Sequence, residues 1–312
     1  MNHPFIYSDD NKRYHTLAYH NRTVKSKTQK AVIDAGLTCP NIDGSKGTGG
    51  CLFCSGGSGY FTKSPSFSIS RQIEEEKERI CKKHPNVGIT AYFQAHTNTY
   101  CSLQKLSGML DEAIGCSGVT GVSIATRPDC LEEDKILLLE KYTKKTDITV
   151  ELGLQTIFDE TAAKINRCYV YREFVRTFEL LKKHRIRTCV HIINGLPGED
   201  KAMMVKTAET LGKLRPDAVK IHLLHVIKGT RLECALESGA YVPLSFDDYV
   251  DTVISQLEVL PPETVIERIT GDGKKDELAA PLWSLDKIRV LGTVDSVMAA
   301  RNTYQGRLYL AE

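Results

Sequence analysis

Three cysteines in a glycine-rich loop are the residues of this chain best suited to bind a metal. Cys39, Cys51 and Cys54 lie in the segment C-P-N-I-D-G-S-K-G-T-G-G-C-L-F-C. The C-x-x-C spacing of the last two lets both thiolates reach one metal centre. The glycines between the first two let the backbone fold closely around whatever the sulfurs hold, because glycine accepts positive φ at little cost. The loop therefore predicts a metal site.

Three thiolates are one short of the four that complete an iron–sulfur cluster or a structural zinc site. Either a fourth protein ligand lies elsewhere in the chain, or an open coordination position accepts a small molecule. Three cysteines and one histidine binding zinc would satisfy the first possibility. The second would make the loop part of a reactive centre.

The elements that must position this loop alternate along the chain. Apolar runs rich in β-branched residues lie at 31–35, 87–95, 119–125, 148–154, 188–194 and 218–226. Amphipathic helical stretches lie at 68–83, 103–114, 131–144, 174–184 and 202–214. Short strands alternating with helices imply a parallel sheet with right-handed crossovers. The pattern predicts an α/β fold, a partial (β/α)6 TIM-like barrel, with ligands at the carboxyl ends of its strands.

The chain divides into three predicted parts. Residues 1–30 form a basic, aromatic-containing arm, 31–240 the barrel, and 241–312 a C-terminal α+β extension that covers the barrel. The arm is either a solvated leader that wraps the barrel or a segment that contacts RNA phosphates.

Composition narrows the class of protein. The 312 residues carry a net charge of +2 and are 41% hydrophobic, which is typical of a soluble globular protein. The polar first twenty residues are unlike a signal peptide, and no apolar run approaches the ~20 residues that cross a bilayer. Ten cysteines without a leader favour a cytoplasmic protein over one with a disulfide framework. No membrane partner is expected.

The cysteine loop resembles the cluster loop of radical S-adenosylmethionine (SAM) enzymes. In that superfamily three cysteines bind a [4Fe–4S] cluster and SAM chelates the fourth iron. The resemblance makes Cys39, Cys51 and Cys54 the cluster ligands and Phe53 the aromatic residue before the last of them. The long spacing between the first two cysteines is similar to that of the Elp3-like branch. The sequence of the loop resembles that of the YtqA/YhcC-type (MnmL-like) subgroup of this branch.

The same resemblance implies which residues contact SAM. Gln94 stands after the second strand, where the family places a polar residue for the SAM amino group. The motif Leu-Gly-Leu-Gln, followed by Asn-Arg, assigns Gln155 to the ribose or methionine part and Arg167 to the carboxylate. The full implied set is Phe53, Gln94, Asn98, Arg127, Glu151, Gln155, Arg167 and His191.

Several of these residues have a second interpretation. Arg127 suits a carboxylate or phosphate but could equally pair with Asp129 and brace the barrel rim. Glu151 is a charge inside an apolar strand, which requires a partner. A ribose contact or a buried ion pair with Arg127 would supply one. His191 is either a hydrogen-bonded core residue or part of the ligand site.

The resemblance implies radical chemistry. SAM cleavage yields methionine and a 5′-deoxyadenosyl radical that abstracts hydrogen from the substrate, with an electron donor such as flavodoxin or ferredoxin. The catalytic residues are unknown; Cys101 and Cys168 are the candidates. The subgroup implies a tRNA substrate, whose wobble carboxymethylaminomethyl-uridine is processed toward aminomethyl-uridine. The alternatives are a small-molecule enzyme like the coproporphyrinogen oxidases and a non-enzymatic iron–sulfur or zinc-binding protein.

Overall fold

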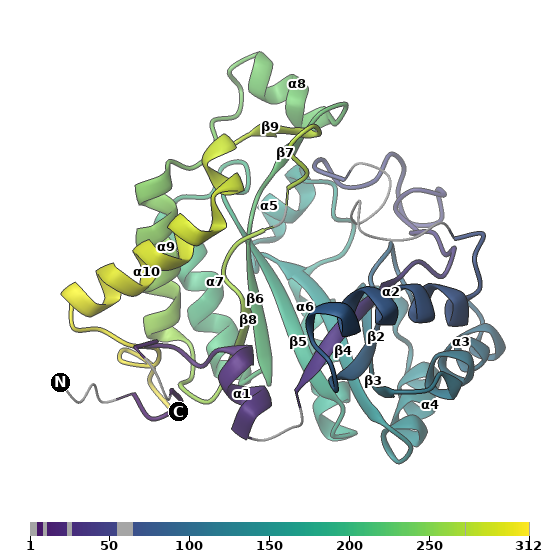
Figure 1. Cartoon of the computed structure of the whole chain (residues 1–312). Helices are drawn as coiled ribbons and strands as arrows, with labels where there is room; N and C mark the ends of the chain where they lie inside the picture. Colours follow the sequence, from purple (N-terminus) through teal and green to yellow (C-terminus); the bar gives the residue numbers. More distant parts are fainter. Residues whose placement is uncertain (1–4, 9–10, 24–26, 55–64, 272, 312) are drawn as a thin grey trace.

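Seven parallel strands form one sheet that curls into a half-barrel in the computed structural model of the chain (Figure 1). The structure describes residues 5–8, 11–23, 27–54, 65–271 and 273–311. The order of the sheet is β1-β2-β3-β4-β5-β6-β8. Its strands are β1 (Thr28–Ile33), β2 (Gly88–Phe93), β3 (Val119–Thr126), β4 (Asp147–Gln155), β5 (Arg187–Asn194), β6 (Ala218–Leu223) and β8 (Val265–Arg268).

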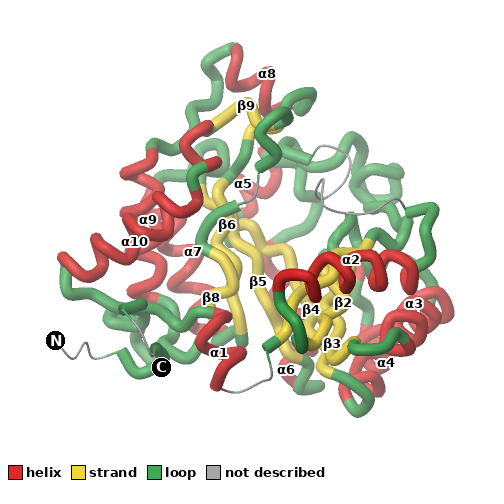
Figure 2. Tube along the Cα trace, in the orientation of Figure 1, coloured by secondary structure: helices red, strands yellow, loops and turns green. Residues whose placement is uncertain are grey.

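Helices follow the strands and flank the sheet (Figure 2). The crossover helices are α2 (Ile69–Lys83), α3 (Leu103–Gly115), α4 (Glu133–Thr143), α5 (Asp159–Lys164), α6 (Tyr171–Lys183) and α7 (Lys201–Leu214). The others are α1 (Leu17–Thr23), α8 (Arg231–Glu237), α9 (Phe246–Val259), α10 (Lys287–Ala300) and the 3-10 turns Pro128–Cys130 and Leu282–Leu285. A short antiparallel pair, β7 (Val226–Ile227) and β9 (Leu278–Ala280), lies beside α8.

The crossover helices pack on the sheet through the apolar residues that the sequence pattern identified. Ile73 of α2, Leu110 of α3 and Phe178 of α6 are fully buried in the main core. In the strands, Phe93 and Leu152 are equally buried. Burying such side chains stabilises the fold by about 2 kcal/mol each and fixes which face of every strand meets the helices. The other face lines the inside of the curl.

The α/β half-barrel with a C-terminal extension is confirmed, with one difference in strand count. The sequence analysis placed residues 241–312 in an extension outside the barrel, whereas β8, which lies in this part, pairs in parallel with β6 as the seventh strand of the sheet. A contribution of the extension to the sheet was missed because β6 and β8 are separated by two helices. Pairing between distant segments carries no local signal.

Among the described residues of the predicted basic arm, several pack against the rest of the chain. Tyr14 and His15 are buried, Thr16 bridges to Ile266, and Lys30 belongs to β1.

In the part of the chain that the structure describes, no helix has the length and apolar character needed to cross a membrane.

Candidate metal and cofactor site

The cluster loop, residues 39–54, follows β1 at the carboxyl edge of the sheet. Its three cysteines are half-buried, and the amide of Cys54 donates to the carbonyl of Cys51 over 3.0 Å. Burial and the neighbouring thiols of Cys54 and Cys39 raise the pKa of Cys51 to about 11. The thiols of Cys54 and Cys39 therefore lie near enough to Cys51 to influence its pKa.

An asparagine clasp, Asn41 with Asn166, fixes the loop to the turn after α5. Asn41 is fully buried, and its Nδ2 donates to the carbonyl of Asn166 and lies 3.6 Å from Cys51 Sγ. In return, Asn166 Nδ2 donates to the carbonyl of Gly50 over 2.8 Å and to that of Thr48 over 3.0 Å. An amide directed at a cysteine sulfur is the type of contact that tunes a cluster's reduction potential.

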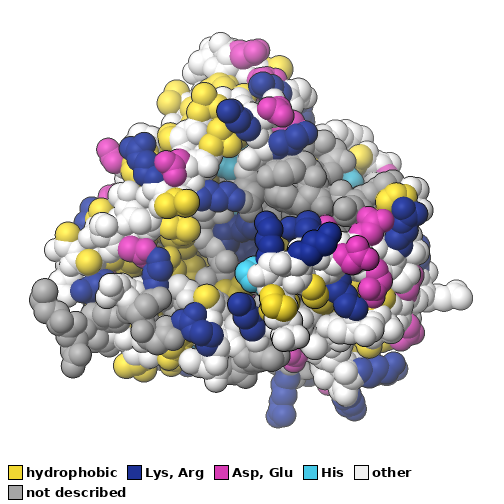
Figure 3. Space-filling model, viewed as in Figure 1, with side chains coloured by type: hydrophobic (Ala, Val, Ile, Leu, Met, Phe, Trp, Pro, Cys, Tyr) yellow, Lys and Arg dark blue, Asp and Glu magenta, His cyan; other side chains and the backbone are white. Residues whose placement is uncertain are grey.

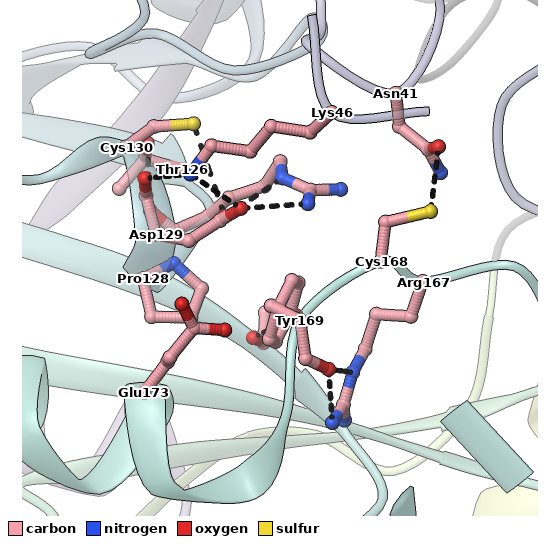
Figure 4. A network of polar contacts seen from close by, with 12 residues as sticks. Asn41, Lys46, Thr126, Pro128, Asp129, Cys130, Arg167, Cys168, Tyr169 and Glu173 are labelled. Atoms are coloured by element: carbon pink, nitrogen blue, oxygen red, sulfur yellow. Dashed lines mark hydrogen bonds and ion pairs between the residues drawn. The ribbon is translucent and has the colours of Figure 1, made fainter. Parts of the chain in front are cut away.

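A second anchor runs from the loop to the end of β3 (Figure 4). Lys46 Nζ lies 2.9 Å from Asp129 Oδ2, and Arg127 donates from Nε and Nη2 to the two carboxylate oxygens, each over 2.9 Å. Burial by itself would raise the pKa of Asp129, but Arg127 and Lys46 hold it below its ordinary value. Of the two interpretations of Arg127, the structure shows the pairing with Asp129, and it places the guanidinium above the Tyr169 ring.

Arg167 occupies a structural position in this arrangement. It is 1% exposed, and its guanidinium donates to the main-chain carbonyls of Leu154, Thr156 and Tyr169. Those bonds hold the end of β4 against the following turn and use the donors that the SAM carboxylate would need. The assigned contact between Arg167 and SAM therefore requires this arrangement to open.

The two predicted glutamines stand at strand ends with half-buried side chains. Gln94 directly follows β2, and Gln155 ends β4, where its Oε1 accepts from the Tyr169 hydroxyl over 2.8 Å. Gln155, Asn166 and Cys168 all have positive φ, which is uncommon for residues with a Cβ and is concentrated at functional sites. Asn98, by contrast, is fully buried, and its Nδ2 donates to the carbonyls of Phe93, Ala95 and Ala125.

Glu151 has partners other than the expected Arg127. Its carboxylate pairs with Lys30 at 2.7 Å, with Lys220, and with His191 Nε2 at 2.8 Å. Tyr92 also donates to it over 2.8 Å. Burial would raise the pKa of Glu151, but Lys220 and Lys30 hold it well below the ordinary value. The proposed ion pair with Arg127 is wrong, because Arg127 lies at the rim and pairs with Asp129.

His191 joins the Glu151 network rather than the cluster loop. Burial, with Lys220 nearby, lowers its pKa, and its ring lies 5.0 Å from that of His222. The ligand atoms of Glu151, Cys189 and His191 lie within 4.8 Å of one another, which is a spacing that a metal could use. Two lysines on the same carboxylate already neutralise it, so this trio is a poor site for a further cation.

The remaining predicted residues are Phe53, Cys168 and Cys101, and they differ in how near they lie to the cluster loop. Phe53 packs with Ile165, Leu196 and Leu224 in a small apolar cluster below the loop. Cys168 is exposed beside the clasp, with Sγ 3.1 Å from Asn41 Oδ1. Cys101 packs against the main core near Lys135 and Lys105, and burial raises the pKa of its thiol. The structure thus brings Cys168, not Cys101, to the cluster loop.

Sequence reasoning missed Asn41, Lys46, Lys30 and Lys220. The sequence did contain a sign of Lys220, because it is a charged residue in an apolar strand, as Glu151 is. The ion pair between Lys220 and Glu151 explains why both charges lie in strands. Asn41 and Lys46 lie inside the cysteine motif, but their partners come from distant turns. Their importance could not be inferred from local spacing.

The residues present fit a [4Fe–4S] cluster. The donor set consists of thiols, and the positive charge of Arg127 acts to lower the pKa of Cys51 against the effect of burial. Three cysteines leave the fourth iron for a small-molecule ligand. The clasp and the ion pair with Asp129 hold the loop in place mainly through main-chain carbonyls and a carboxylate, and the one cluster sulfur that they contact is that of Cys51.

Comparison with known proteins agrees with this chemistry. Residues 43–211 match the radical SAM superfamily, and residues 216–300 match the radical SAM C-terminal domain. The uncharacterized protein YtqA of Bacillus subtilis is 43% identical over 311 residues, which cover 99% of this chain and 97% of YtqA. A tRNA uridine(34) acetyltransferase of Methanocaldococcus jannaschii is 29% identical over 152 residues, 48% of this chain and 28% of that protein.

A solved structure shows the same fold. The archaeal Methanocaldococcus infernus Elp3 with an N-terminal deletion superposes with a TM-score of 0.68 at 18% identity, over 90% of this chain and 64% of that one. The superfamily match spans more than half of the chain, and YtqA is related along nearly its whole length. The chain therefore belongs to the radical SAM superfamily of enzymes.

Proposed function

We propose that this enzyme acts on the wobble uridine of tRNA, in the step that processes carboxymethylaminomethyl-uridine toward aminomethyl-uridine. The observation that carries the proposal is the cluster loop. It combines the cysteine spacing of the Elp3-like branch with a clasp that ties it to the Asn166 turn. The partial similarity to a tRNA uridine(34) acetyltransferase supports a uridine at this tRNA position as the substrate.

In this proposal the chain's residues hold and orient the reactants. Cys39, Cys51 and Cys54 bind the cluster, while Gln94 and Gln155, at the ends of β2 and β4, offer amide groups to SAM. A [4Fe–4S] cluster with SAM, when bound and reduced by flavodoxin or ferredoxin, supplies a 5′-deoxyadenosyl radical. Phe53 and the apolar cluster around it exclude water from one side of the site.

Cys168 is the proposed hydrogen donor or acceptor, because its thiol is exposed beside the loop. A Cys168→Ser variant should retain its iron and its ability to cleave SAM but lose product formation. Cys234→Ser, an exposed cysteine on α8, is the matched control. Full product formation by Cys168→Ser would assign the thiol a structural role only.

Two measurements test the function. Anaerobically reconstituted protein should convert SAM to 5′-deoxyadenosine, and a Cys51→Ala variant should not. Cells lacking the gene should accumulate carboxymethylaminomethyl-uridine in tRNA, with aminomethyl-uridine restored by the wild-type gene and not by Cys51→Ala. Unchanged wobble uridines together with SAM cleavage would exclude the tRNA substrate and favour a small-molecule substrate.

A further inference from the structure

A cavity of about 800 Å³ opens on the concave face of the half-barrel. Figure 3 shows Lys and Arg side chains gathered around the hollow in the middle of this face. Among the described residues, its wall includes Lys30, Lys220, Arg187, Glu267 and Gln94, and none of the three cluster cysteines. The cavity is therefore distinct from the metal site but reaches one of the residues proposed to contact SAM.

In the wall of the cavity, the side chains of Lys30 and Arg187 are more exposed than those of the carboxylates with which they pair. The side chains of Glu151 and Glu267 are 0% and 2% exposed. The cations that pair with them reach the surface: Lys30 is 28% exposed and Arg187 is 21% exposed. Lys30 Nζ lies 2.7 Å from Glu151 and 2.8 Å from Glu267, and Arg187 Nη1 lies 3.2 Å from Glu267. A ligand in the cavity thus meets ammonium and guanidinium groups first.

The cations of this network outnumber the carboxylates with which they form ion pairs. Three cations, Lys30, Lys220 and Arg187, share two carboxylates. The carboxylates raise the pKa of Lys30 and of Lys220 against the effect of burial, so both stay protonated at neutral pH. At the rim, Arg79 pairs with Glu76 at 2.7 Å. Asp217 is a further acidic neighbour that helps to raise the pKa of Arg187. Lys30 and Arg187 are the partly exposed cations of this network, so an anion in the cavity can reach both of them.

The position of the network along the strands points to the substrate rather than to SAM. Glu151 precedes Gln155 by four residues in β4, which corresponds to ~13 Å along the strand. The cluster loop and Gln155 lie at the carboxyl edge of the sheet, whereas Lys30 and Arg187 lie toward its middle and amino edge. A group held between Lys30 and Arg187 would extend inward from the reactive edge.

We propose that Lys30 and Arg187, braced by Lys220 through Glu151, bind an anionic oxygen group of the substrate. This inference rests on the proposed function, in which the carboxymethylaminomethyl group carries a carboxylate. A phosphate of the RNA backbone has the same chemistry and is the second possible source. Lys30 is a binding residue in this account, and Lys220 is a positioning residue.

Lys30→Gln is the informative substitution because it leaves each carboxylate with a cation. Glu151 keeps Lys220 and His191, and Glu267 keeps Arg187. Lys30→Arg retains the charge at the same place. Lys206→Gln, on the outer surface of α7, removes an exposed lysine that pairs with Glu209 and serves as the matched control. Arg187→Gln is a second test should Lys30→Gln fail to fold.

The test measures equilibrium binding without turnover. Two anticodon stem-loop RNAs, one with carboxymethylaminomethyl-uridine and one with aminomethyl-uridine at the wobble position, are titrated anaerobically with reconstituted enzyme lacking SAM, at one salt concentration. A charge-assisted hydrogen bond to the carboxylate should make the first RNA bind about tenfold more tightly. Lys30→Gln should remove this preference, whereas Lys30→Arg and Lys206→Gln should keep it.

The outcomes separate this inference from the proposed function. Equal weakening of both RNAs by Lys30→Gln, but not by Lys206→Gln, identifies a backbone phosphate as the anion. Unchanged binding of both RNAs to Lys30→Gln and Arg187→Gln overturns the anion site and leaves the tRNA function standing. Failure of wild-type enzyme to bind either RNA overturns both.

Discussion

Lys46 of the cluster loop and Asp129 in the 3-10 turn after β3 form an ion pair across 83 positions of sequence, with Nζ 2.9 Å from Oδ2. The same carboxylate receives both donors of Arg127. One aspartate therefore joins the cluster loop to the rim of the half-barrel through its contacts with Lys46 and Arg127.

Asp129→Asn should destabilise the fold and weaken iron binding. Its side chain is 2% exposed, so the substitution leaves Arg127 partly buried with a neutral partner. We expect the free energy of unfolding to fall by ~2 kcal/mol. Urea denaturation and the iron content after reconstitution measure the two effects. Glu209→Gln, in the exposed pair with Lys206, should change neither, and equal behaviour of the two variants would contradict the role of Asp129.

Each cluster cysteine should be needed for iron binding. Replacing Cys39, Cys51 or Cys54 by alanine removes one of three ligands, so the content should fall from about four irons per chain to nearly none. Iron analysis and the visible absorption of the cluster follow this loss. Cys234→Ala, at an exposed cysteine outside the loop sequence, should retain full iron. Retention of iron by Cys39→Ala would show that the C-x-x-C pair has another partner.

Arg167→Lys should act on stability. Lysine cannot reach the carbonyls of Leu154, Thr156 and Tyr169 together, and the loss leaves buried acceptors without donors. We expect unfolding to become easier by ~3 kcal/mol. Thermal melting of the apo-protein checks this directly. An unchanged melting temperature combined with lost SAM binding would instead support the contact with the SAM carboxylate that family resemblance assigns.

Glu267 should make the fold sensitive to acid. Burial would raise the pKa of Glu267, but Lys30 and Lys220 lower it from 4.5 to about 2. Because the folded pKa lies below the unfolded one, the stabilisation is complete above about pH 4.5 and is lost as the pH falls toward 2.

Glu267→Gln should lose this contribution, which is at most ~3 kcal/mol at neutral pH. Urea unfolding of wild type and variant at several pH values between 7 and 3 provides the comparison, in which the two stabilities should converge as pH falls. A constant gap between them at every pH would show that Glu267 acts through packing and not through its charge.

Gly47→Ala should disturb the asparagine clasp. A Cβ at this position would collide with Asn41 Oδ1 and lie 2.7 Å from Cys168 Sγ. Both neighbours are held by other bonds, so we expect a loss of ~1–3 kcal/mol and weaker iron retention. Gly108→Ala in α3, where no atom lies within 4 Å of the added carbon, should be neutral or slightly stabilising. Equal iron content in both variants would show that Asn41 and Cys168 can move to accommodate the added carbon without loss of iron.

The sequence by itself determined the class of fold and predicted the cluster loop. Thiolate spacing is local, so the prediction that Cys39, Cys51 and Cys54 bind a cluster depends on no distant contact. The alternation of apolar strands with helical stretches likewise depends on short-range periodicity. Both patterns can be recognised in the sequence alone because each involves only residues that are close together along the chain.

The tertiary structure alone decided which polar residues meet. Lys30 reaches Glu151 across 121 positions, and Asn41 reaches Asn166 across 125. Such pairs are set by sheet register and by the packing of crossovers, which no local pattern encodes. For the same reason the sequence could show that Glu151 needed a partner but not that Lys30 and Lys220 were its partners. A buried charge requires a partner, and the tertiary structure determines which residues are that partner.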